Sequence, residues 1–105
     1  MVSDLIVYDD RSKDLTYFHQ LKTLPNTFEA VKNGTKNFEL RKNDRNFHVG
    51  DTVSLVLFEP DRDTFAYNQQ FNHLEFRIVG ILRNCPGLDP GYVILQLGPL
   101  TEKED

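Results

Sequence analysis

The chain has 105 residues, with 12 Lys and Arg against 16 Asp and Glu, one Cys and no Trp, and its formal charge is −4. This length fits one domain, and a hydrophobic content of 39% supports a core, which argues against a disordered chain. No apolar run approaches the ~20 residues that a membrane helix needs. The lone Cys85 excludes an internal disulfide framework and a Cys-based zinc cluster. We therefore expect a cytoplasmic protein without membrane association.

A basic segment lies within this acidic chain. Residues 22–45 carry a net charge of +3 and the remaining residues a net charge of −7. A pI near 5.3 disfavours the broad coating of nucleic acid, which needs a positive field. The basic segment fits either a solvated charged face or a local surface that binds anions.

The first elements in chain order are a possible strand, a second strand and a helix. Residues 1–16 form an N-terminal extension in which Leu5–Tyr8 is compatible with a short strand. The main domain, residues 17–100, begins with an aromatic-rich strand over 17–22. A helix then begins at Pro25 and ends at Asn33-Gly34.

The rest of the chain reads as strands. Strands are predicted over 36–41, 52–59, 74–82 and 92–97, with a polar loop or weak hairpin arm over 64–73 and a frayed tail over 101–105. We expect an α+β fold, mainly β, in the form of a small barrel or strongly curved sheet of five to six strands with one or two short helices. The later strands have no helices between them, so parallel βαβ winding is not expected.

The alternation in residues 36–41 places Phe38 and Leu40 on one face of a strand and Glu39 and Arg41 on the other. We expect the apolar face to point inward and Phe38→Ala to cost about 3–5 kcal/mol. The core residues that the pattern predicts are Phe38, Leu40, Val53, Leu55, Leu57, Ile78, Val93 and Leu95.

Metal and cofactor chemistry has little support in the sequence. His19, His48 and His73 lie 29 and 25 residues apart, without helical i+4 partners or a Cys cluster. The six glycines occur singly, so no glycine-rich phosphate loop is present, and we expect no cofactor. Cys85 fits an incidental thiol better than a nucleophile, and a structural role is the better interpretation of His19 and Asp51.

The densest group of polar side chains lies in residues 34–45. Lys36 follows the glycine that ends the helix, and Glu39 and Arg41 project from the same face of a strand. Such a group can bind a planar anionic ligand, or Lys36 and Glu39 can act as an acid–base pair. The alternative is an exposed ladder of ion pairs, worth about 0–1 kcal/mol each.

Five short motifs in this region and beyond it resemble one known family. They are His19-x-Leu21-Lys22, Pro25-x-x-Phe28, Gly34-x-Lys36-x-Phe38-Glu39-Leu40-Arg41-Lys42-Asn43-Asp44-Arg45, Phe47-x-Val49-Gly50-Asp51 and Gly91-Tyr92-Val93-Ile94-Leu95. Together they are similar to the ASCH domains of the PUA-like superfamily, and more narrowly to an uncharacterised ASCH-related family of bacteria and phages. The resemblance covers about residues 17–97.

The resemblance implies a small PUA-like β-barrel whose cleft binds RNA or a nucleotide-like molecule. The ligand-binding residues that it suggests are Lys22, Lys36, Glu39, Arg41, Lys42, Asn43, Asp44 and Arg45, with Phe47 or Tyr92 as a surface for base stacking. Some small relatives hydrolyse N4-acetylcytidine with a Lys, a Thr and a Glu. Lys36 matches that Lys, Glu39 occupies the Thr position, and the downstream Glu has only Glu59 and Glu75 as candidates.

Two alternatives to RNA binding therefore stay open. One is an amidohydrolase that acts on a modified nucleoside, with Lys36 and Glu39 as its catalytic residues. The other is a module that binds a protein partner and no nucleic acid.

Overall fold

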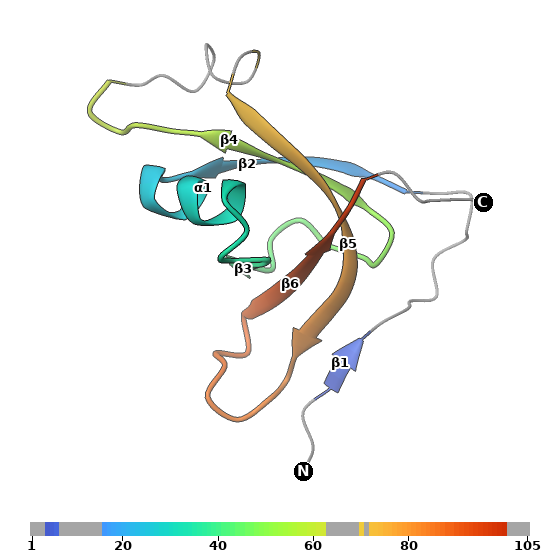
Figure 1. Cartoon of the computed structure of the whole chain (residues 1–105). Coiled ribbons are helices and arrows are strands. Elements are labelled where there is room, and N and C mark those ends of the chain that lie inside the picture. The colour runs from blue at the N-terminus through green and yellow to red at the C-terminus, as the bar shows by residue number, and fades with distance from the viewer. Residues whose placement is uncertain (1–3, 7–15, 63–69, 71, 101–105) are drawn as a thin grey trace, which may run out of the picture.

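A computed structural model of the chain describes residues 4–6, 16–62, 70 and 72–100. Within these residues the elements are β1 (Asp4–Ile6), β2 (Phe18–Thr23), α1 (Pro25–Lys32), β3 (Phe38–Lys42), β4 (Thr52–Leu57), β5 (His73–Arg83) and β6 (Tyr92–Gly98), as Figure 1 shows. The helix and the five main strands are those that the sequence predicts, with ends shifted by no more than two residues. The predicted tail over 101–105 and most of the predicted loop over 64–73 lie outside the described residues.

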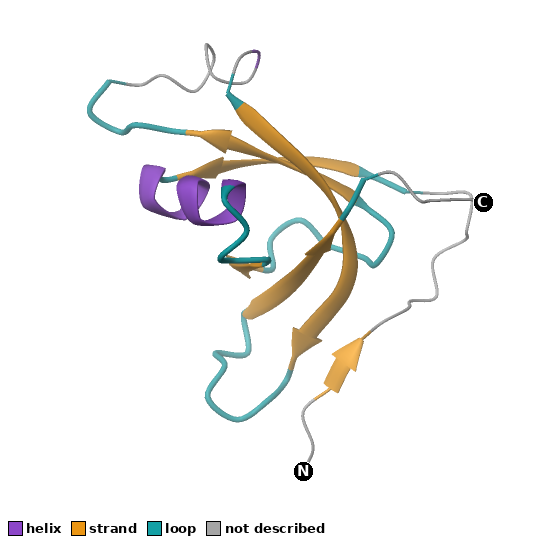
Figure 2. Cartoon of the chain, viewed as in Figure 1, coloured by secondary structure: helices purple, strands orange, loops and turns teal. Residues whose placement is uncertain are grey.

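The strands form one sheet in the order β2-β4-β5-β6-β3, and β1 pairs with β5 beside this path. All pairs are antiparallel except β2 with β4, which is parallel. The sheet curls into a half-barrel around one short helix (Figure 2). The expected closed barrel is therefore wrong and the strongly curved sheet is right, because the edge strands β2 and β3 share no ladder of hydrogen bonds.

The curl of the sheet has a local cause in β5. The pairing of β5 with β6 shifts register between Ile78 and Gly80, so that Val79 is an extra residue on its strand. A bulge of this kind bends a strand and increases its twist. Gly98 on β6 fits this bend, because a Cβ there would lie 2.7 Å from Cγ1 of Val79.

The core fills the concave side of the sheet. Val53, Leu55, Ile78, Val93 and Leu95 are fully buried there, as the alternation of the strands predicts. Helix α1 packs against this side through its two buried residues, Phe28 and Val31. Leu57, the last residue of β4, is only half-buried.

The predicted facing of β3 is wrong. Phe38 and Leu40 are 46% and 54% exposed, whereas Glu39 is only 3% exposed. The register explains the inversion, because Glu39 pairs with Leu95 and paired residues project from the same face of a sheet. Phe38→Ala therefore removes less buried apolar area than the same change would at a core position. The expected cost of about 3–5 kcal/mol is too high for this residue.

Candidate functional site

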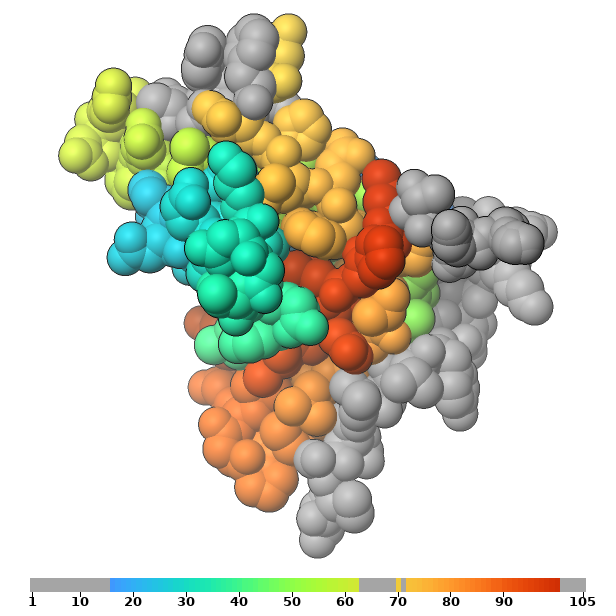
Figure 3. All heavy atoms as spheres, viewed as in Figure 1, coloured from blue at the N-terminus to red at the C-terminus, as the bar shows by residue number. Residues whose placement is uncertain are grey.

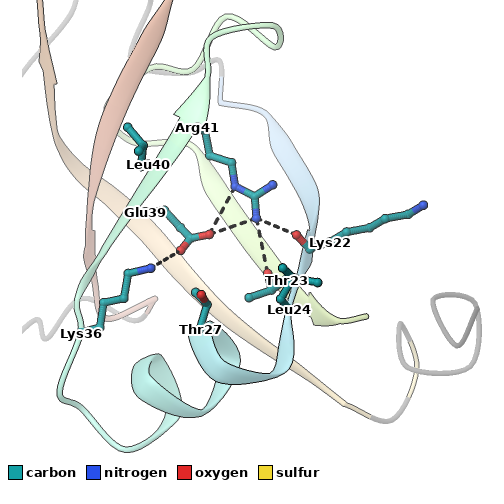
Figure 4. A pocket seen from close by; sticks show the side chains of 8 residues that line it. All are labelled: Lys22, Thr23, Leu24, Thr27, Lys36, Glu39, Leu40 and Arg41. Atoms are coloured by element: carbon teal, nitrogen blue, oxygen red, sulfur yellow. Dashed lines mark hydrogen bonds and ion pairs between the residues drawn. The ribbon is translucent and has the colours of Figure 1, made fainter. Parts of the chain in front are cut away.

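A hollow of about 360 Å³ opens between β2, the start of α1 and β3 (Figure 4). We call it the cleft. Its lining residues are Lys22, Thr23, Leu24, Thr27, Lys36, Glu39, Leu40 and Arg41. In the space-filling view, helix α1 and the segment that leads into β3 lie across the open side of the curled sheet (Figure 3). The cleft thus lies where the two edges of the sheet approach each other.

The turn after α1 fixes the position of Lys36. Gly34 has a φ of +86°, a left-handed conformation that glycine adopts without steric cost. The Thr35 hydroxyl donates to the Ala30 carbonyl at 3.2 Å, and the Lys36 N–H donates to the same carbonyl at 3.1 Å. These bonds hold the chain against the end of the helix, so the Lys36 side chain enters the cleft beside β3.

Glu39 is a buried carboxylate held between two cations. Lys36 Nζ donates to Glu39 Oε1 at 3.1 Å, and Arg41 donates to Oε2 through Nη2 at 3.0 Å and through Nε at 3.3 Å. A buried carboxylate needs such partners, because its removal from water is otherwise costly. Figure 4 shows the two cations reaching Glu39 from opposite sides. These residues therefore do not form the exposed ladder of ion pairs that was the alternative interpretation.

Arg41 also spans the gap between the two sheet edges. Its Nη2 donates to the Lys22 carbonyl at 2.7 Å and lies 3.5 Å from the Thr23 hydroxyl oxygen. Arg45, beyond the end of β3, makes a similar bridge, since its Nη1 donates to the Gln20 carbonyl at 2.7 Å. Two arginine side chains therefore join β3 and the turn after it to β2, where a closed barrel would have a backbone ladder.

The other predicted cleft residues divide between the cleft and its surroundings. The Lys22 side chain points away from Glu39 and Arg41 in Figure 4, and its Nζ lies 4.5 Å from the centre of the Phe58 ring. The Asn43 N–H donates to the Gly91 carbonyl at 2.9 Å, which ties the turn after β3 to the turn before β6. Lys42, Asp44 and Arg45 line a second, smaller hollow instead of the cleft.

Neither predicted stacking residue lies in the cleft. Phe47 is only 2% exposed and packs edge-on against His19, with ring centres 4.8 Å apart, so it offers no free face to a base. Tyr92 is partly exposed but pairs with Lys42 in the ladder, on the outer face of the sheet. The suggestion that Phe47 stacks on a base is therefore wrong, and Tyr92 does not line the cleft.

His19 and Asp51 form a buried structural unit. Asp51 is fully buried and accepts hydrogen bonds from His19 Nε2 at 2.9 Å, from the Tyr17 N–H at 3.0 Å and from the His48 N–H at 3.1 Å. A carboxylate only accepts hydrogen bonds, so the His19 proton lies on Nε2. The unit ties the start of β2 to the turn before β4 and leaves His19 no part in the cleft.

Two polar residues that line the cleft escaped the sequence analysis. Thr23 is buried at the end of β2, where its hydroxyl donates to the Leu21 carbonyl at 3.1 Å, and Thr27 lines the cleft from the first turn of α1. The alternation of β2 offered a signal for Thr23, because His19 and Leu21 share its inward face. For Thr27 no such signal exists, since its place depends on how α1 packs.

Two further findings concern the rest of the described residues. Within them, no three His, Cys, Asp or Glu side chains gather closely enough to hold a metal ion. In the same part of the chain, no helix has the length and apolar character needed to cross a membrane.

The comparison with known families gives one match. A family model described as a domain of unknown function, DUF3850, matches residues 18–97, which include every residue that lines the cleft. The chain belongs to the DUF3850 family. No curated protein matches the sequence.

Proposed function

We propose that this DUF3850 chain is an ASCH-like, PUA-like domain that binds RNA or a nucleotide-sized part of it in the cleft. The observation that carries the proposal is the pair of cations, Lys36 and Arg41, held on one buried carboxylate at a hollow of ligand size. Ligand pockets usually measure about 300–1,000 Å³, and the cleft falls within that range. The resemblance to ASCH domains supports RNA as the polyanion.

The hydrogen-bonding capacity of the cleft favours a ligand rich in acceptors. Both oxygens of Glu39 are already bonded to cations, whereas Lys36 Nζ makes one hydrogen bond and Arg41 Nη1 makes none with any described residue. A guanidinium presents five N–H donors and an ammonium three, so several donors are left for a ligand. Phosphate oxygens and base carbonyls are the acceptors that a nucleotide offers.

The amidohydrolase alternative has weaker support. Glu39 is bonded by both cations, and it occupies the position at which the resemblance expects a nucleophilic Thr. We therefore place Glu39 as the residue that positions Lys36 and Arg41. Hydrolysis of N4-acetylcytidine that disappears in Lys36→Gln would contradict this assignment.

Binding of short RNA at increasing salt tests the proposal. We expect a fluorescently labelled random hexamer to bind at low ionic strength and to weaken with salt, because cations on the protein displace counterions from the RNA. Lys36→Gln should make the slope of log affinity against log salt shallower by about 0.7. The matched control is Lys32→Gln, which removes the same charge from an exposed position at the end of α1 and should leave the slope unchanged.

Three outcomes of this titration would overturn the proposal. They are no binding at low salt, binding that does not respond to salt, and equal effects of the two lysine variants. Capture of a protein from lysate that survives nuclease treatment, together with no RNA binding, would favour the protein-interaction alternative.

A further inference from the structure

A second hollow lies beside the cleft, on the other side of Arg41. It measures about 90 Å³ and is lined by Leu21, Arg41, Lys42, Asp44, Arg45 and Phe47. Arg41 is the residue that lines both spaces. The second hollow is therefore a neighbour of the cleft, with the Arg41 side chain between them.

Charge distinguishes these two spaces from the rest of the molecule. Without Lys22, whose charge points away, they are lined by Lys36, Arg41, Lys42 and Arg45 against Glu39 and Asp44, a net charge of +2 in a chain whose net charge is −4. In the second hollow the carboxylate of Asp44 is 62% exposed and lies 3.8 Å from Arg45 Nε, a distance that leaves most of the guanidinium unused. The buried residues Leu21 and Phe47 form its apolar floor.

The two arginines of the second hollow are held at a fixed spacing. Arg41 donates to the Lys22 carbonyl and Arg45 to the Gln20 carbonyl, each at 2.7 Å. These carbonyls lie two residues apart on β2, which corresponds to about 6–7 Å along a strand. Two guanidinium groups at this spacing can each donate to a different oxygen of one phosphate group, since such charge-assisted bonds are about 2.7–2.9 Å long.

The size of the second hollow selects what fits there. At about 90 Å³ against about 360 Å³ for the cleft, the second hollow suits the smaller part of a nucleotide, the phosphate group. The cleft, about four times larger, has the size for the nucleoside.

We infer that the second hollow is a phosphate subsite, and that the ligand is a phosphorylated nucleotide whose nucleoside lies in the cleft. The inference rests on the proposed function and adds to it the ligand class and the role of Arg45. Arg45 here is a binding residue that donates to the phosphate oxygens held in the second hollow.

The test compares the four ribonucleosides with their monophosphates by calorimetry at constant ionic strength. We expect the wild-type chain to bind at least one monophosphate about 10–100-fold more tightly than the nucleoside, the range expected for charge-assisted bonds to phosphate. Arg45→Gln should reduce this ratio to below about fivefold, through a loss of monophosphate affinity. Lys32→Gln should preserve the ratio, and Arg45→Lys, which keeps the charge without the planar fork, should give an intermediate ratio.

Each contrary result has a distinct meaning. Equal wild-type affinity for nucleoside and monophosphate, or a phosphate preference that persists in Arg45→Gln, overturns the subsite and leaves the proposed function standing. If the chain binds no nucleoside, nucleotide or RNA, both the phosphate subsite and the proposed function are overturned. Circular dichroism and thermal unfolding of each variant show whether it is folded. If Arg45→Gln is not folded, the ratio measured for Arg45→Lys decides whether the second hollow is a phosphate subsite.

Discussion

Asp51→Ala is expected to destabilise the fold by about 3–5 kcal/mol, because it removes the acceptor of three hydrogen bonds and each donor left without a partner costs about 1–3 kcal/mol. Asp51 is fully buried and accepts hydrogen bonds from His19, Tyr17 and His48. Its loss leaves a buried imidazole N–H and two backbone N–H groups without their acceptor. Such a loss is large against a total stability of about 5–15 kcal/mol.

Urea unfolding followed by far-UV circular dichroism measures this effect. The matched control is Asp89→Ala in the turn before β6, where Asp89 accepts one exposed hydrogen bond from the Gly91 N–H at 2.9 Å. We expect the control to lose less than about 1 kcal/mol, since a single exposed bond contributes little. Equal losses in the two variants would show that Asp51 does not hold β2 to the turn before β4.

Arg41→Ala is expected to lower RNA affinity by about 10–100-fold, because Arg41 lines both hollows and presents charge-assisted donors to each. The same change leaves Glu39 with Lys36 alone and removes the bond to the Lys22 carbonyl. We therefore also expect a loss of about 2–3 kcal/mol of stability, below the range for a fully buried pair because Arg41 is 24% exposed.

Two further variants separate charge from geometry at this position. Arg41→Lys keeps the positive charge but cannot bridge Glu39 and β2 through one planar group, so we expect it to recover only part of the affinity. Arg62→Ala is the matched control, since Arg62 is 69% exposed and lies 3.7 Å from Glu59, away from both hollows. Anisotropy titrations with the labelled hexamer measure all three, and an affinity of Arg41→Ala equal to that of Arg62→Ala would contradict the role of Arg41.

Local patterns in the sequence predicted most of the secondary structure. Aromatic-rich, apolar and alternating runs located the five main strands, and Pro25 with Asn33-Gly34 marked the limits of α1. These features depend on residues that are close together in the sequence, so the sequence alone predicts them. The grouping of Lys36, Glu39 and Arg41 followed in the same way, from proximity in the sequence.

Long-range contacts account for what the sequence analysis missed. The facing of β3 depends on its register with β6 and on the cations that compensate the burial of Glu39. Phe47 lies among polar residues in the sequence, yet its ring packs on His19, which lies on β2.

Long-range strand pairing also explains why the barrel is open. Because β3 pairs with β6 at the far edge of the sheet, β2 is free to pair in parallel with β4. The arginine bridges across the remaining gap join residues 18–25 positions apart, a connection that no local pattern encodes.

Chemical-shift mapping of the bound chain tests the central claim most directly. The backbone amide resonances of a labelled sample would be followed during titration with the RNA hexamer at low salt. We predict that the largest shifts occur at Thr23, Thr27 and residues 36–41, around the cleft, with little change in the turn over 84–91. Shifts confined to that turn, or none at saturating RNA, would contradict the assignment of the cleft as the binding site.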